Sequence, residues 1–176
     1  MTKKLKALNP APTMFQDILF RIDRRFTAST HINKMTDKKL LGAINNKKSR
    51  LHPENIGKMR TGTMKLLEPR IIASLRGEQV TKLKAKHFNA MSPEQIKAID
   101  VNSIKAINPN AIAGFKSAKF LHFTPEQIGA LTTKQINAMT TKQFNKLTKE
   151  QIQALDLSGI SPRVTARIYS KIFNAM

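Results

Sequence analysis

Apolar residues recur with a period of eight through residues 52–155 of this chain. In each of thirteen consecutive octads, an apolar residue occupies position 5 and another occupies position 8. The pairs are Ile56 and Met59, Met64 and Leu67, Ile72 and Leu75, Val80 and Leu83, Phe88 and Met91, Ile96 and Ile99, Ile104 and Ile107, Ile112 and Phe115, Phe120 and Phe123, Ile128 and Leu131, Ile136 and Met139, Phe144 and Leu147, and Ile152 and Leu155. None of these 26 residues is polar, so the period belongs to the whole segment.

This period excludes a continuous regular element. In an α-helix, eight residues leave a drift of about 80° per octad, so the apolar stripe would wind around the helix. A coiled coil alternates spacings of three and four residues, whereas these spacings alternate three and five. In a strand, positions 5 and 8 would point to opposite faces. The pattern therefore predicts that the chain turns once in every octad.

The polar half of the octad predicts a helix start. Its clearest copies read S-P-E-Q at residues 92–95 and T-P-E-Q at residues 124–127. Ser or Thr at position 1 is a good N-cap, proline is favoured as the first helical residue, and glutamate suits the positive end of the helix dipole. Glutamine at position 4 is the partner that completes a capping box. That column contains Gln79, Gln95, Gln127, Gln135, Gln143 and Gln151.

Each octad is therefore predicted to form a helix of about one and a half turns over positions 2 to 7, followed by a bend. Positions 5 and 8 should face inward, and the glutamines outward as cap partners. A helix this short is unstable alone and must stack on its neighbours. The predicted fold class is an all-α solenoid of short capped helices on an eight-residue repeat, with longer capping helices at both ends. The number of octads in one coil is left open.

The two ends depart from the octad. Residues 1–51 are predicted to form a basic N-terminal cap with an amphipathic helix at about residues 14–26, where apolar residues follow a helical stripe. Residues 52–155 form the array. Residues 156–176 are predicted to contain a C-terminal capping helix, because Val164, Ile168 and Ile172 follow one another at four-residue spacing after Ser161 and Pro162.

The charge balance points to an acidic partner. The chain has 176 residues, with 31 Lys and Arg against 11 Asp and Glu, a net charge of +20. Residues 1–88 carry +14 of this and residues 89–176 carry +6. Such a field attracts nucleic acid through its phosphates, or an acidic protein surface. The candidate binding residues cluster in the irregular N-terminal third: Arg21, Arg24, Arg25, Lys38, Lys39, Lys47, Lys48 and Arg50.

No catalytic chemistry is indicated. There is no cysteine, and His31, His52, His87 and His122 have no metal-ligand spacing. Phosphate-binding glycine loops and nucleophile elbows are missing as well. We expect a non-enzymatic protein with no metal, cofactor or small-molecule substrate. A glutamine can also pair with adenine edges, but a base-reading column should vary, and capping is a sufficient explanation for this one.

The location of the protein is left open. No apolar run approaches the length of about 20 residues that a transmembrane helix needs. The first twelve residues lack the apolar stretch of a signal peptide. Both a cytoplasmic location and export without a cleavable signal peptide are compatible with these features.

The phrase LTTKQINAMTTKQFNKLTKEQIQAL, residues 131–155, resembles the T-x-x-Q-[IV]-x-A-L octapeptide arrays of large bacterial secreted or cell-surface proteins. The resemblance covers roughly residues 92–155. It implies a bacterial source and a scaffold or binding role, and it carries no catalytic residues. Two functions follow as hypotheses. The first is nucleic-acid binding through phosphate contacts, and the alternative is a protein-binding repeat module, for example an exported bacterial effector or scaffold.

Overall fold

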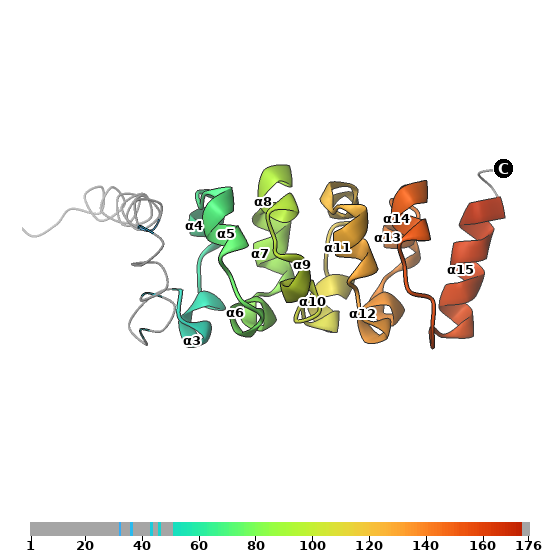
Figure 1. Cartoon of the computed structure of the whole chain (residues 1–176), viewed down its shortest axis with the longest axis horizontal. Coiled ribbons are helices and arrows are strands. Elements are labelled where there is room, and N and C mark those ends of the chain that lie inside the picture. Colours follow the sequence, from blue (N-terminus) through green and yellow to red (C-terminus); the bar gives the residue numbers. More distant parts are fainter. Residues whose placement is uncertain (1–31, 33–35, 37–42, 44–45, 47–50, 174–176) are drawn as a thin grey trace, which may run out of the picture.

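The computed structural model describes residues 32, 36, 43, 46 and 51–173. Over residues 51–173 it is a series of short helices that stack along one long axis (Figure 1). The predicted all-α repeat solenoid is therefore confirmed. The helices are α3 (Pro53–Ile56), α4 (Thr61–Lys65), α5 (Pro69–Ala73), α6 (Gly77–Lys82), α7 (Ala85–Ala90), α8 (Pro93–Lys97), α9 (Val101–Ile104), α10 (Pro109–Ala113), the 3-10 helix η1 (Ser117–His122), α11 (Pro125–Gly129), α12 (Thr133–Ala138), α13 (Thr141–Phe144), α14 (Lys149–Gln153) and α15 (Pro162–Phe173). The amphipathic helix predicted at about residues 14–26 lies outside the described residues.

Every octad contains one helix, and every one of these helices begins at position 2. The residue at position 1 is extended in each case, as Thr132 is with φ −73° and ψ 157°. Proline is the first residue of five octad helices, where its missing N–H costs no hydrogen bond. Most of the helices end at position 5, 6 or 7, and the chain then bends. The prediction of one bend per octad is confirmed.

The predicted capping boxes are present. In α11, the Thr124 hydroxyl accepts a hydrogen bond from the Gln127 N–H at 3.2 Å, and the Gln127 Oε1 accepts one from the Thr124 N–H at 3.0 Å. The same reciprocal pair occurs in the octads that begin at Ser92, Thr132, Thr140 and Thr148. These bonds satisfy N–H groups that a helix start would otherwise leave without a partner.

The apolar pairs form the core. All 26 residues at positions 5 and 8 are buried, with exposed fractions of 9% or less. Four rings pack near the middle of the array, where Phe115 lies 4.7 Å from Phe88 and 5.9 Å from Phe120 between ring centroids. The inward direction predicted for positions 5 and 8 is therefore confirmed.

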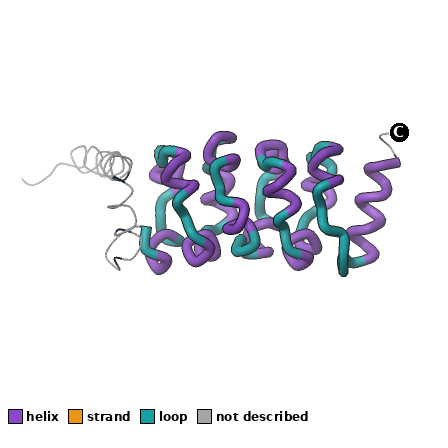
Figure 2. The backbone as a smooth tube through the Cα atoms, in the orientation of Figure 1, coloured by secondary structure: helices purple, strands orange, loops and turns teal. Residues whose placement is uncertain are grey.

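One coil of the solenoid contains about 28 residues. Each helix packs on the third helix after it, as α4 does on α7 and α7 on α10. Hydrogen bonds between side chains of one coil and the backbone of the next span 24 to 31 residues, and 28 is the most frequent separation. A coil therefore contains three and a half octads, and successive coils stack along the long axis (Figure 2).

Small residues allow the coils to approach closely. A Cβ atom on Gly57 would lie 2.6 Å from the Lys82 carbonyl oxygen, and one on Gly129 would lie 2.8 Å from that of Ala154. Both glycines occupy position 6. The prediction placed the close approach at position 7, and there Gly114 also meets a neighbour, with its Cβ site 2.8 Å from the Ala85 methyl group. Both positions are thus constrained by the adjacent coil.

Candidate functional site

The glutamine column lies inside the solenoid, and the prediction that it faces outward is wrong. Gln127 is 1% exposed. Its Oε1 accepts the cap hydrogen bond, while its Nε2 donates to the carbonyl oxygens of Ile96 at 3.0 Å and Ile99 at 2.7 Å. These acceptors occupy positions 5 and 8 of the octad four places earlier. Equivalent bonds are made by Gln95, Gln135, Gln143 and Gln151.

A primary carboxamide suits this position for a chemical reason. Each short helix leaves N–H groups at its start and C=O groups at its end without helical partners. A glutamine side chain has one acceptor oxygen and two N–H donors. It can therefore cap the start of its own helix and the end of a helix in the preceding coil. We call this series of position-4 contacts the glutamine ladder.

The buried ladder removes the base-reading interpretation. All six glutamines at position 4 have exposed fractions of 2% or less. Their amide groups are already bonded to backbone within the solenoid. They are not available to the edges of nucleic-acid bases.

His87 takes the place of a glutamine in the ladder. It is fully buried, its Nδ1 accepts from the Lys84 N–H at 2.9 Å, and its Nε2 lies 2.9 Å from the Met59 carbonyl oxygen. These partners assign the neutral tautomer with the proton on Nε2. Burial lowers the pKa of His87, and the nearby Lys86 and Lys84 lower it further against the raising effect of the Met59 bond. A neutral imidazole thus reproduces the acceptor and donor of a carboxamide.

Cationic side chains extend the ladder. Lys119, at position 4 of its octad, donates to the Met91 carbonyl oxygen at 2.5 Å. In α15, Arg167 donates to Met139 at 3.0 Å, and Lys171 donates to the carbonyl oxygens of Phe144, Asn145 and Leu147. Burial is the main cause that lowers the pKa of both lysines. The long helix α15 thus caps backbone of the last coil.

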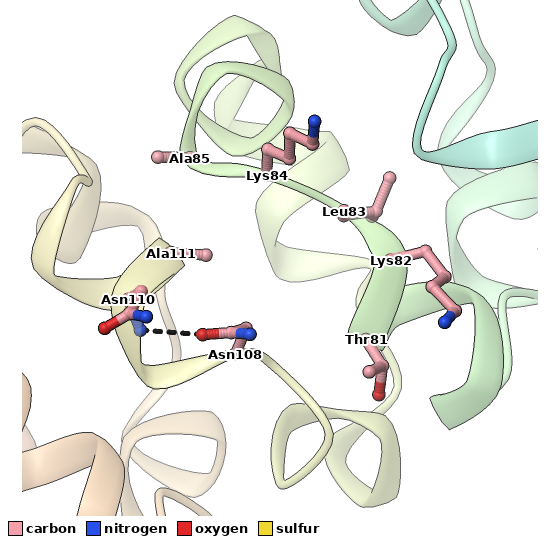
Figure 3. Close-up of a pocket in the computed structure, with 8 residues that line it drawn as sticks. All are labelled: Thr81, Lys82, Leu83, Lys84, Ala85, Asn108, Asn110 and Ala111. Carbon is pink, nitrogen blue, oxygen red and sulfur yellow. Dashed lines mark hydrogen bonds between the residues drawn. The ribbon is translucent and has the colours of Figure 1, made fainter.

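The ladder has one gap within the described residues. From Gln79 to Gln151, nine of the ten position-4 side chains donate to a carbonyl oxygen of the preceding coil. The tenth is Ala111, which has no polar group. A cavity of about 470 Å³ opens there, lined by Thr81, Lys82, Leu83, Lys84, Ala85, Asn108, Asn110 and Ala111. Figure 3 shows the Ala111 methyl group pointing toward the segment that carries Thr81 to Lys84.

A second cavity lies between α12, α13 and α15, with a volume of about 700 Å³. Like the first, it is lined by the bend between two octads and by the start of a helix in the next coil. Here the Arg167 guanidinium occupies the ladder position and donates to the Met139 carbonyl oxygen. The cavity at Ala111 differs because no protein group takes that role.

Charged residues are distributed unevenly around the coil. Because residues 28 apart lie on the same side, the segments 54–65, 82–93, 110–121, 138–149 and 166–173 form one side, which we call the cation-rich side. It carries 13 of the 19 Lys and Arg of residues 51–173 and a single carboxylate, Glu54. The intervening segments, the mixed side, carry 6 cations and 7 carboxylates. The Arg70–Glu68 ion pair, at 2.8 Å, belongs to the mixed side.

The binding residues predicted in the N-terminal third stay a prediction. Arg21, Arg24, Arg25, Lys38, Lys39, Lys47, Lys48 and Arg50 all lie outside the described residues. The sequence did contain the signal for the cation-rich side, but finding it requires the 28-residue coil. Along residues 51–173, no helix combines the length and the apolar character needed to cross a bilayer.

These features define an α-helical repeat protein. Residues 120–157 match the ALTTAQ repeat family, which covers the most regular octads and the resemblance noted above. Comparisons with curated proteins and with solved structures found no match.

Proposed function

We propose that this repeat protein is non-enzymatic and presents a basic surface to an acidic macromolecule, foremost nucleic acid through phosphate contacts. The observation that carries the proposal is the cation-rich side, which holds 13 cations against one carboxylate. The mixed side is close to neutral, so the net charge of the array comes from one side alone. An asymmetric field of this kind orients a polyanion as well as attracting it.

The arrangement suits a linear polyanion. Residues on the cation-rich side recur in every coil and so form a row along the solenoid axis. Ten of its cations have no hydrogen-bond or ion-pair partner among the described residues: Lys58, Arg60, Lys65, Lys82, Lys84, Lys86, Lys116, Lys142, Lys146 and Lys149. Their binding to phosphates would release condensed counterions, which is the main source of sequence-independent affinity. The N-terminal cluster that includes Lys47, Lys48 and Arg50 would add further contacts.

A salt titration of DNA binding with matched variants tests this proposal. Lys58, Lys86 and Lys142 are exposed on the cation-rich side, and Lys97, Lys105 and Lys134 are exposed on the mixed side. Alanine at the first three positions removes the same charge as alanine at the second three. We expect the first triple variant to reduce the slope of log Kobs against log salt concentration by up to about 2.7, from about 0.9 per lost phosphate contact. The second should change the slope much less.

Two outcomes would contradict the proposal. One is no detectable binding of DNA or RNA at about 50 mM salt, where phosphate contacts are strongest. The other is an equal change of slope in the two triple variants, since net charge alone would then explain the binding. Replacing Lys47, Lys48 and Arg50 with alanine tests the N-terminal cluster in the same assay.

A protein-binding repeat module is the second candidate function. It is favoured by the match of residues 120–157 to the ALTTAQ repeat and by the resemblance to bacterial octapeptide arrays. In this case the protein would be bacterial, for example an exported effector or scaffold, and the cation-rich side would meet an acidic protein surface. A pull-down from lysate with and without nuclease separates the two candidates, because nuclease treatment releases partners held by nucleic acid only.

A further inference from the structure

The gap at Ala111 leaves two backbone groups without the partners that the rest of the ladder supplies. Wherever a glutamine occupies position 4, its Oε1 accepts from the position-1 N–H and its Nε2 donates to a position-8 carbonyl. The corresponding groups at the gap are the Asn108 N–H and the Leu83 C=O. Neither has a hydrogen-bond partner among the described residues. Leu83 is only 2% exposed, so its carbonyl oxygen has little access to bulk water.

Both groups face the cavity of about 470 Å³, because Leu83 and Asn108 line it together with Ala111. Asn108 does not close the gap with its own side chain, since its Oδ1 accepts from the Asn110 N–H at 2.8 Å (Figure 3). Thr81 is likewise engaged, because its hydroxyl donates to the Ala106 carbonyl oxygen at 2.9 Å. The space is therefore bounded by one backbone donor and one backbone acceptor with the spacing that a carboxamide bridges in five other octads.

We propose that this cavity binds a primary carboxamide. The carboxamide oxygen would accept from the Asn108 N–H, and its NH2 group would donate to the Leu83 C=O. A buried polar group without a partner is costly, so a ligand that satisfies both groups at once is favoured over an apolar one of the same shape. This inference is independent of the proposed nucleic-acid function, because it rests on the ladder and not on the charge distribution.

The remainder of the cavity indicates what carries the carboxamide. A carboxamide group fills only a small part of the available volume, and Lys82 and Lys84 lie at the same cavity. Both lysines are exposed and belong to the cation-rich side. They favour a carrier with a negative charge near the amide. The ligand would therefore be an anionic molecule with a primary amide, or a glutamine beside an acidic residue in a peptide.

NMR titration of the labelled full chain with propionamide tests the proposal. We expect shifts of the Asn108 amide and of the Lys84 amide, which shares its peptide unit with the Leu83 carbonyl. An amide of this size should bind with a Kd of about a millimolar. Methyl propionate has a similar shape but no N–H donor, and it should bind at least tenfold more weakly. Equal binding of the ester, or no shift at either amide, would overturn the proposal without any variant.

Two matched variants locate the site. Ala111→Gln supplies the missing side chain, so it should raise the melting temperature and weaken propionamide binding at least tenfold. Ala113→Gln adds the same side chain at an exposed position of the same helix and should leave binding unchanged. Undiminished binding to the Ala111→Gln chain, or a loss of stability in it, would show that the gap does not fit a carboxamide.

The source of the ligand is distinguished with two further probes. Succinamate carries a carboxamide and a carboxylate on a small molecule, and an acetylated Gln-Glu dipeptide carries them on a peptide. Tighter binding of succinamate than of propionamide at low salt supports the contribution of Lys82 and Lys84. Binding of the dipeptide as well would indicate a protein segment as the ligand, whereas binding of succinamate alone would indicate a small molecule.

Discussion

Residues 60–91 and residues 124–155 each contain four octads and differ sharply in their polar residues. In 124–155 every N-cap is threonine and every position-4 residue is glutamine. In 60–91 the N-caps are Arg60, Glu68, Arg76 and Lys84, none with a side-chain cap bond, and position 4 holds Thr63, Ile71, Gln79 and His87. Yet in both regions the helices begin at position 2 and the apolar pairs are equally buried. The apolar pair is therefore enough to set the bend, and the polar box adds stability.

The polar residues of the earlier region are less well satisfied. The Thr63 hydroxyl is buried with no hydrogen-bond partner among the described residues. Ile71 at position 4 is buried but offers no donor at all. Because unsatisfied buried groups are costly, residues 60–91 should be the less stable of the two regions. The predictions below compare equivalent positions in the two regions.

The largest effect is expected at the apolar pair. Ile136→Asn and Ile72→Asn each replace an isoleucine that is at most 1% exposed. Each change removes apolar burial and leaves an amide without partners, so we expect a loss of about 4 kcal/mol in the free energy of unfolding. Denaturant unfolding measures it. A clearly smaller loss for Ile72→Asn would show that the bend in residues 60–91 has another cause.

The next effect is expected at the ladder. Loss of a cap partner alone would cost about 1 kcal/mol. Gln135→Ala also leaves the buried carbonyls of Ile104 and Ile107 without their donor, so we expect about 2–3 kcal/mol. Gln79→Ala loses a single such bond, to Leu51, and should cost less. Equal unfolding midpoints for Gln135→Ala and an exposed control, Asn137→Ala, would show that the ladder does not stabilise the array.

A smaller effect is expected at the N-cap. Thr132→Ala removes a hydroxyl that accepts from the Gln135 N–H, and should cost about 1 kcal/mol. Arg76→Thr places such a hydroxyl before Gln79, where the box lacks it, and should stabilise by about 0.5–1 kcal/mol. Thermal melts of the two variants should therefore shift in opposite directions. A destabilised Arg76→Thr chain would mean that Arg76 has a structural role beyond the cap.

The smallest effect at neutral pH is expected for His87→Gln, because a carboxamide offers the same acceptor and donor. The folded chain binds a proton on His87 less readily than the unfolded chain, whose pKa is about 6.5. The free energy of unfolding should thus be constant above this pH and fall as the pH drops from it toward the lowered pKa. His87→Gln should remove that part of the fall. Melting temperatures from about pH 7.5 to about pH 5 measure it, and identical profiles would contradict the neutral ladder histidine.

Much of the fold could be predicted from the sequence because its determinants are local. Proline at position 2 and hydroxyl residues at position 1 specify helix starts through contacts within four residues, and positions 5 and 8 identify the core. The size of the coil could not be predicted, because it depends on bond partners about 28 residues apart. The burial of the glutamines was missed for the same reason. A signal did exist, since position 4 contains no acidic residue and admits Ile71 and Ala111.

The half-integral number of octads per coil has a consequence for how such a chain can evolve. Duplication or deletion of one octad preserves the spacing of the core residues, but it rotates everything downstream by about 100°, since eight residues are eight twenty-eighths of a turn. The interior would tolerate the event while the exterior was rearranged. Only a change of seven octads, two full coils, restores the original alignment of surface residues. Gains and losses of single repeats therefore offer a direct route to new binding surfaces on an unchanged scaffold.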